Sequence, residues 1–160
     1  MSSSPYYSKV SRSLKNLKER KLVGVDINKI LLTCNKDAWL KASNDNQPKP
    51  ESKENKKTKF KPGVFAKNSR IKDVEWILNT TRGTNDYIHC SHLIYLYDQN
   101  INPVVARWLG DSSRAFNDAY ALTELIQWVW RSRVRRGEPI TIYLPSLRMR
   151  RIFEEWLYGP

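Results

Sequence analysis

The segment from residue 119 to residue 144 most constrains the fold of this chain. Its apolar residues follow the spacing of one helix face: Ala119, Leu122, Ile126 and Val129. Gln127, Arg131 and Arg135 lie four residues apart, which predicts a polar row on the opposite side of the same helix. Arginine keeps its charge and offers a rigid fork of donors, so we expect this row to bind phosphate groups. The alternative is a solvated basic face.

Short apolar runs alternate with helical patterns along the chain. We expect strands at residues 29–34, 74–78, 92–97 and 140–144. We expect helices beginning at residue 37, over 103–109, from a cap at Asn117 or Asp118 to Gly137, and from Ser146 to Gly159. Most of the strands are apolar throughout, which is typical of parallel strands covered on both faces. The order therefore predicts an α/β fold with a mainly parallel sheet flanked by helices.

The composition predicts a polyanionic partner. The chain has 160 residues, with 28 Lys+Arg against 16 Asp+Glu and a formal net charge of +12 at pH 7. Nucleic acid is the simplest such partner, because phosphate neutralisation dominates its binding, and DNA and RNA stay equally open. An anionic membrane would also attract the chain. However, no apolar run approaches the ~18–20 residues that span a bilayer, so we expect no membrane partner.

A basic arm and one domain of ordinary size are expected. Residues 1–21 are rich in Ser, Lys and Arg, and we expect Lys15, Lys18 and Arg20 to contact nucleic acid. Residues 22–160 are expected to form the α/β domain. A stretch at about 43–62 is too charged and too rich in proline to bury much surface, so it predicts a disordered insertion. Two cysteines make no disulfide framework, which favours the cytoplasm, or the nucleoid or nucleus alongside nucleic acid.

Several motifs follow one another between residues 74 and 145. They are a strand, an Arg-Gly loop, a strand ending at Tyr97-Asp98, the pair Asn102-Pro103, a Gln-x-x-x-Arg helix and a strand after a glycine. This order resembles the C-terminal RecA-like domain of superfamily-two (DEAD-box-like) helicases. The resemblance implies a RecA-like, P-loop NTPase-type sheet. It also implies that residues 80–86 are the family's fifth motif and that Gln127 through Arg135 are its sixth.

The resemblance assigns roles to both motifs. In the sixth, Gln127 would belong to the catalytic site, and Arg131 and Arg135 would be arginine fingers that act only beside a partner domain. In the fifth, four residues are expected to contact nucleic acid: Thr81, Arg82, Gly83 and Thr84. Asn85 and Asp86 are expected to be linked to the nucleotide. A glycine here lets backbone N–H groups approach a phosphate, and a tight turn is the alternative reading of this loop.

The sequence also departs from the family's pattern. Val134 stands where the second finger arginine usually lies, and Trp130 replaces the glycine before the first. No G-x-x-x-x-G-K-[ST] loop occurs, since residues 63–67 lack the second glycine and the Gly-Lys pair, and no acidic box follows an apolar strand. We therefore expect no ATPase activity from this chain alone. ATP and magnesium would bind only where a partner domain completes the site.

Two further groups of residues have chemistry that the motifs do not use. His89, Cys90, His92 and Cys34 are residue types that bind zinc, but their spacing matches no standard zinc module, so we predict no metal site. Among the six tryptophans, Trp128 and Trp130 lie beside the arginines and are candidates for stacking on bases. Trp76 and Trp156 are expected in the core.

These observations predict a nucleic-acid-binding domain of the helicase C-terminal type. It would be an auxiliary or partial helicase that acts with a separate ATPase-bearing domain or subunit in nucleic-acid replication or remodelling. Two alternatives stay open. One is a basic nucleic-acid-binding accessory protein that uses the fold only as a scaffold, and the other is an inactive helicase remnant or a competitor of the full helicase.

Overall fold

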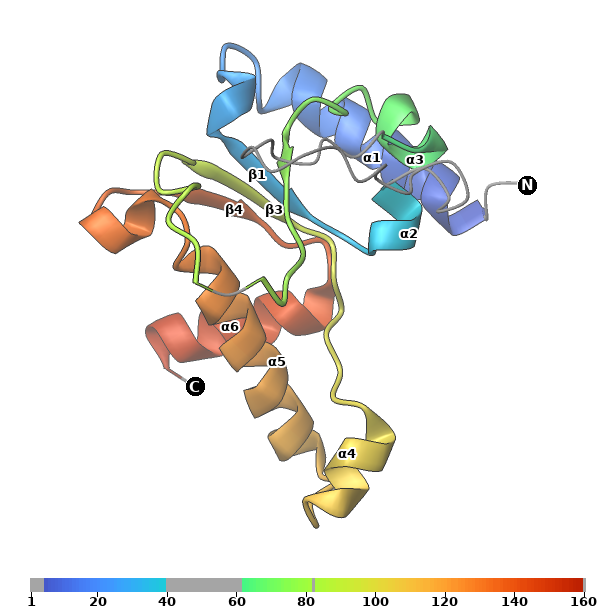
Figure 1. Ribbon diagram of the computed structural model, residues 1–160, viewed down its shortest axis with the longest axis vertical. Helices are drawn as coiled ribbons and strands as arrows, with labels where there is room; N and C mark the ends of the chain where they lie inside the picture. Colours follow the sequence, from blue (N-terminus) through green and yellow to red (C-terminus); the bar gives the residue numbers. More distant parts are fainter. Residues whose placement is uncertain (1–4, 40–61, 82, 160) are drawn as a thin grey trace, which may run out of the picture. The chain divides into compact units, whose positions relative to one another are not determined.

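The computed structural model describes residues 5–39, 62–81 and 83–159 of the chain (Figure 1). The chain forms two compact units, of which the first comprises residues 1–27 with 35–74 and the second residues 28–34 with 75–160. The predicted insertion at about 43–62 lies outside the described residues, apart from Pro62. In the part of the chain that the structure describes, no helix is both long enough and apolar enough to cross a membrane.

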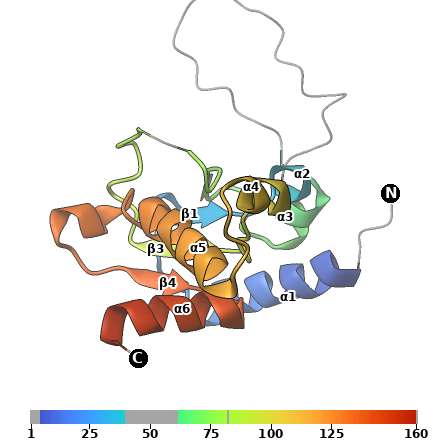
Figure 2. The same ribbon diagram turned by 90° about the horizontal axis from the view of Figure 1, so that it is seen from below.

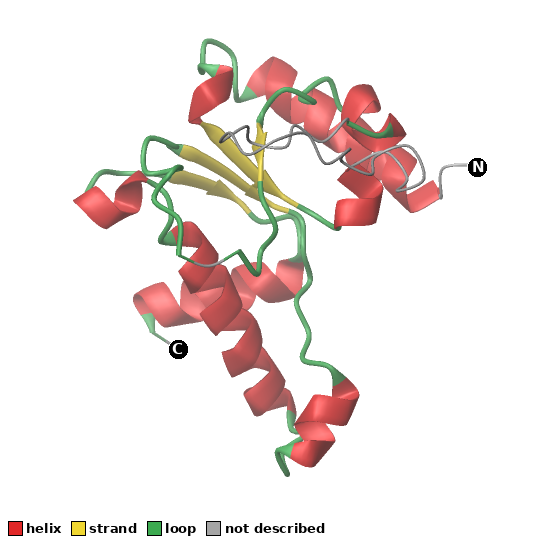
Figure 3. Ribbon diagram, viewed as in Figure 1, coloured by secondary structure: helices red, strands yellow, loops and turns green. Residues whose placement is uncertain are grey.

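A four-stranded parallel sheet organises the second unit (Figure 3). Its strands are β1 (Ile30–Thr33), β2 (Glu75–Trp76), β3 (His92–Tyr95) and β4 (Thr141–Tyr143). They lie in the order β2-β1-β3-β4, and every neighbouring pair is parallel. The predicted α/β fold with a mainly parallel sheet is therefore confirmed, although β2 and β3 are shorter than the expected ranges 74–78 and 92–97.

Helices α5 (Arg114–Val129) and α6 (Leu147–Tyr158) pack on this sheet and build the core of the second unit. They lie side by side in Figure 2. Alternate strand residues point to one face of a sheet, and here Leu31, Leu93 and Tyr95 share the face that meets the helices. The helices contribute these fully buried residues to the same cluster: Leu125, Trp128 and Met149. The described part of this unit also has two shorter helices after β3, α4 (Pro103–Trp108) and the 3-10 helix η3 (Arg133–Arg136). A further 3-10 helix, η1 (Ile27–Lys29), leads into β1.

Helix α5 begins earlier than its sequence pattern predicts. Ser113 is its N-cap, because the Ser113 Oγ accepts a hydrogen bond from the Phe116 N–H at 3.1 Å. The predicted cap at Asn117 or Asp118 is therefore wrong. Serine oxygens satisfy the free N–H groups of a first helical turn, so Ser113 takes this role as well as asparagine or aspartate would.

The same helix also ends earlier, at Val129 instead of Gly137. The Val129 carbonyl accepts hydrogen bonds from both the N–H and the Oγ of Ser132, at 3.1 and 2.7 Å. The Arg133 N–H, which a continuing helix would direct to Val129, donates instead to the Cys90 carbonyl at 3.2 Å. These bonds replace the next helical turn. The expected helical row of Gln127, Arg131 and Arg135 is therefore wrong, because both arginines follow the helix.

The buried face of α5 differs from the expected one as well. Ala121, Leu125, Trp128 and Val129 are buried, whereas Ala119 is exposed. Leu122 and Ile126, the other two members of the expected stripe, are half-buried. Trp128 decides which face is covered, since its ring packs edge-on against Tyr95 with the ring centroids 5.3 Å apart. Its predicted role as an accessible stacking platform is wrong.

The described part of the first unit consists of α1 (Pro5–Arg20), α2 (Lys36–Trp39) and α3 (Val64–Asn68). Phe65 of α3 packs against the rings of Tyr7 and Trp39, with centroids 5.4 and 5.9 Å apart. The Lys18 Nζ donates a hydrogen bond to the Arg70 carbonyl at 2.6 Å. Within residues 1–21, the predicted basic arm, residues 5–20 are thus a helix that packs inside its own unit.

Candidate nucleic-acid interface

One face of α1 carries an exposed row of basic side chains. Lys9, Arg12, Asn16 and Arg20 follow the three- and four-residue spacing of a single helix face, and all four are exposed. Ser11 and Leu14 lie on the opposite face and are buried. The apolar side fixes the helix against its unit, and the basic side is left facing outward. We call Lys9, Arg12 and Arg20 the α1 row.

The three predicted binding residues of this helix have different surroundings. Arg20 belongs to the α1 row, whereas Lys15 lies 4.0 Å from the Glu19 carboxylate and Lys18 bonds the Arg70 carbonyl. Arg70 also pairs with Glu19 at 3.5 Å. Lys15 and Lys18 therefore have contacts inside the unit. Lys9, which sequence reasoning missed, becomes visible as a binding candidate once the helix is known to continue over all of Pro5–Arg20.

The excess positive charge of the chain is concentrated in the first unit. That unit contains 17 of the 28 Lys+Arg and 7 of the 16 Asp+Glu, which gives a net charge of +10. The second unit contains the remaining 11 and 9, which gives +2. Most of the net positive charge therefore belongs to the unit that contains the α1 row.

In the second unit, the structure brings the predicted loop and the predicted arginine segment together. The Arg135 Nη1 donates a hydrogen bond to the Asn85 Oδ1, which joins η3 to the loop. Gly83 has a φ of 68°, a conformation that favours glycine, and the Asp86 N–H donates to the Thr84 Oγ1 at 3.2 Å. Thr81 is half-buried, and Arg82 lies outside the described residues. The contact lies near the amino ends of β3 and β4, since these segments lead into those strands.

The two candidate finger arginines differ in accessibility. Arg131 is only 7% exposed, which corrects the expectation that it lies on an accessible polar face of the helix. Arg135 is exposed, and Gln127 is half-buried on α5. Arg133 is held by the Pro139 carbonyl, to which its Nε donates at 2.6 Å, and it lies 3.8 Å from Glu138. Arg135 is therefore the candidate finger that a partner could reach.

The structure also gives the positions of the tryptophans and cysteines that the sequence singled out. Trp130 is half exposed, and so is Trp156, so the expected core position of Trp156 is wrong. Cys34 follows β1 at its carboxyl end, whereas Cys90 precedes β3 at its amino end, so the two thiols lie toward opposite edges of the sheet. Burial raises the pKa of both thiols to about 12. Burial, with the nearby Arg133 charge, lowers the pKa of His92.

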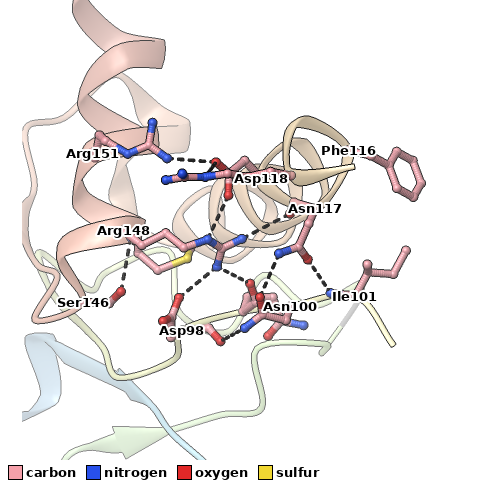
Figure 4. A network of polar contacts seen from close by, with 12 residues as sticks. Asp98, Asn100, Ile101, Phe116, Asn117, Asp118, Ser146, Arg148 and Arg151 are labelled. Carbon is pink, nitrogen blue, oxygen red and sulfur yellow. Dashed lines mark hydrogen bonds and ion pairs between the residues drawn. The ribbon is translucent and has the colours of Figure 1, made fainter. Parts of the chain in front are cut away.

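The most connected polar cluster of the second unit is one that the sequence did not reveal (Figure 4). Arg148, near the start of α6, donates to Asp118 at 2.8 Å and to Asp98 at 2.9 Å, and also to the carbonyls of Gln99 and Asn117. Arg151 donates to the other oxygen of Asp118 at 2.8 Å. The bonded pairs are 30 to 50 positions apart in the sequence, so no local motif indicates them.

This cluster occupies the carboxyl ends of β3 and β4, the edge where open α/β sheets usually bind ligands. Burial alone would raise the pKa of Asp118, but the hydrogen bonds from Arg151 and Arg148 outweigh it and lower that pKa. The Asp118 carboxylate is therefore kept ionised, and both it and the Asp98 carboxylate contact an arginine of α6. The arrangement joins the end of β3, the start of α5 and the start of α6.

Comparisons with known proteins show which family the chain belongs to. A family model described as the YonV C-terminal Rossmann-like domain matches residues 1–157. A relative from Bacillus subtilis (strain 168), an SPbeta prophage-derived uncharacterized protein named YonV, is 34% identical over 110 residues. That match covers 68% of this chain but 27% of the relative, so the chain spans only part of that protein's length. No solved structure matches. The chain belongs to the family of YonV C-terminal Rossmann-like domains.

Proposed function

We propose that this chain binds the phosphate backbone of nucleic acid, with little preference for base sequence. The α1 row carries this proposal, because three exposed cations share one face of a helix whose other face is fixed by packing. At ~1.5 Å per residue, the row extends over roughly 16 Å, enough to follow several phosphates of one strand. The net charge of +10 in the same unit would steer a polyanion towards it.

Lysine and arginine contacts to phosphates fix position but do not distinguish bases. Within α1, Asn16 is the amide side chain on the face of the α1 row. Each phosphate that the α1 row neutralises releases bound counterions, so the free energy of binding depends strongly on salt concentration. The proposal therefore concerns general nucleic-acid binding, to DNA or RNA.

The motif order supports a finer form of the same proposal, a partial helicase acting with a separate ATPase-bearing domain or subunit. The contact between Arg135 and Asn85 supports it, since it joins the segments that resemble the sixth and fifth helicase motifs. In such a complex the exposed Arg135 would reach the nucleotide of the partner domain, which would supply the ATP and magnesium sites. The alternative is an accessory protein that binds nucleic acid and uses this fold as a scaffold.

The test of backbone binding is a salt titration. Affinity of the purified chain for a labelled duplex and for a labelled single strand is measured across a range of salt concentrations. We expect the logarithm of the association constant to fall linearly with the logarithm of salt, by about 0.9 per phosphate contacted on the duplex. No binding at low salt, or a flat dependence on salt, would contradict the proposal.

A further inference from the structure

Helix α4 presents an exposed apolar surface that the packing of its unit does not use. Val104 is 73% exposed, Trp108 83% and Leu109, the residue that ends the helix, 52%. Within α4, all of which is described, only Ala106 is buried. Figure 1 shows α4 and the first turns of α5 extending away from the strands of the second unit. A cluster of this kind is typical of a binding surface, because large apolar side chains are seldom gathered in water.

Side-chain hydrogen bonds hold the segment that carries α4, which we call the projection (residues 100–117). Asn102 caps α4, its Oδ1 accepting from the Val104 N–H at 2.9 Å, and Pro103 fixes the first helical position. Below it, the Asn117 Oδ1 accepts from the Ile101 N–H at 2.9 Å, and the Asn117 Nδ2 donates to the Asn100 Oδ1 at 2.8 Å (Figure 4). The tip is thus preorganised, so a ligand would spend little free energy on ordering it.

An exposed arginine lies next to the indole of the tip. Arg107 on α4 is exposed, as is Arg114 at the start of α5. Asp111 is the only acidic residue between positions 102 and 116. Its carboxylate accepts a hydrogen bond from the Ser113 N–H at 2.7 Å, and this bond lowers its pKa. Arg114 lies 3.8 Å from the Asp118 carboxylate, so its charge is partly balanced there. The tip therefore combines an exposed indole with one exposed arginine, Arg107, on the same helix.

The size of the surface argues against a protein partner. A stable protein–protein interface takes about 20–30 residues from each side, and α4 has six. The next residues that are exposed on α5 are small or polar, such as Ala115, Ala119 and Thr123. A single nucleobase, by contrast, needs only one aromatic ring on which to stack.

We propose that Trp108 stacks on an unpaired base of single-stranded nucleic acid, with Val104 and Leu109 flanking the base and Arg107 on the neighbouring phosphate. This inference rests on the proposed backbone binding and narrows its ligand to strands with accessible bases. A base-paired duplex keeps its bases stacked on one another and offers the indole no free face.

Binding of an oligothymidylate and of an abasic oligomer of the same length tests the proposal. The chain should bind the oligothymidylate more tightly. Trp108→Ala should weaken binding of the oligothymidylate roughly 5- to 150-fold and leave binding of the abasic oligomer unchanged. Trp108→Phe should restore most of the loss, since phenylalanine keeps an aromatic face. Trp156→Ala removes an indole that is also half exposed, and it should change neither affinity.

Three results would overturn the proposal. One is an equal loss on both oligomers for Trp108→Ala. Another is equal binding of both oligomers by the unaltered chain, which leaves backbone binding intact. The third is a Trp108→Ala variant that loses self-association, or binding to vesicles of anionic lipid, while keeping its affinity for the oligothymidylate. Absence of binding to either oligomer at low salt would instead contradict the proposed function itself.

Discussion

Arg131 and Arg135 are four residues apart in the sequence, and their surroundings decide what each can do. Arg131 is buried among residues that include Tyr87, whose pKa is raised by burial and by nearby carboxylates and partly lowered again by the Arg131 charge. Arg135 is exposed and contacts Asn85. A buried guanidinium contributes packing through its stem as well as charge, so its loss affects the fold.

Replacing each arginine by alanine tests which of the two side chains supports the fold. Arg131→Ala should lower the free energy of unfolding by about 1–3 kcal/mol, because it removes the packing of a buried side chain. Arg135→Ala should change it by less than ~0.5 kcal/mol, as is usual for exposed positions. Denaturant unfolding of the two variants measures both values. Coinciding unfolding curves for Arg131→Ala and the unaltered chain would show that Arg131 has no structural role.

At the scale of helices and strands, periodicity predicts which elements exist better than it predicts where they stop. The strands at β1, β3 and β4 and the helices α4 and α6 were predictable, because their apolar runs and capping residues are local. The end of α5 was not, since it depends on the bond between Arg133 and the Cys90 carbonyl, a contact across 43 positions. The sequence of α5 also contains a second apolar face, formed by Ala121, Leu125 and Trp128. This second face is the one that is buried.

The start of α5 can be tested at its cap. Ser113→Ala should lower the free energy of unfolding by about 0.5–2 kcal/mol, because it removes the acceptor of the Phe116 N–H. The neighbouring Ser112→Ala is the matched control, since Ser112 is exposed and does not cap the helix. Thermal melts of both variants provide the comparison. If Ser112→Ala is the more destabilising of the two, the helix does not begin where the structure places it.

The arginine cluster at the start of α6 should stabilise the second unit. Arg148→Ala removes hydrogen bonds to two carboxylates and two carbonyls, and should cost about 1–3 kcal/mol. Arg114→Ala is the control, because its side chain is 80% exposed and lies 3.8 Å from Asp118. That change should cost less than ~0.5 kcal/mol. Equal melting temperatures for the two variants would mean that the cluster adds no stability.

At the scale of the whole molecule, the sequence predicts the α/β class and the sign of the charge, but not how that charge is distributed. The division into two units depends on chain segments that alternate between them, at residues 27–28, 34–35 and 74–75. Such a division follows from tertiary packing and leaves no local signal. The α1 row was only partly predictable for the same reason, since its exposed face is defined by what the opposite face packs against. The RecA-like and helicase assignments go beyond the Rossmann-like family that the comparisons establish.

A matched pair of charge reversals tests whether the α1 row contacts nucleic-acid phosphates. Arg12→Glu with Arg20→Glu is compared with Lys29→Glu and Arg136→Glu, which reverse two exposed charges in the second unit. Both variants have the same net charge, so non-specific repulsion is matched. Binding to a labelled duplex is measured against salt for each.

We predict that the α1 variant loses most of its affinity at low salt and that its log–log salt slope becomes shallower by about 2, one unit for each phosphate contact removed. The second-unit variant should keep the slope of the unaltered chain. Equal losses of affinity and equal slopes for the two variants would contradict this prediction, because binding would then follow net charge and not the α1 row.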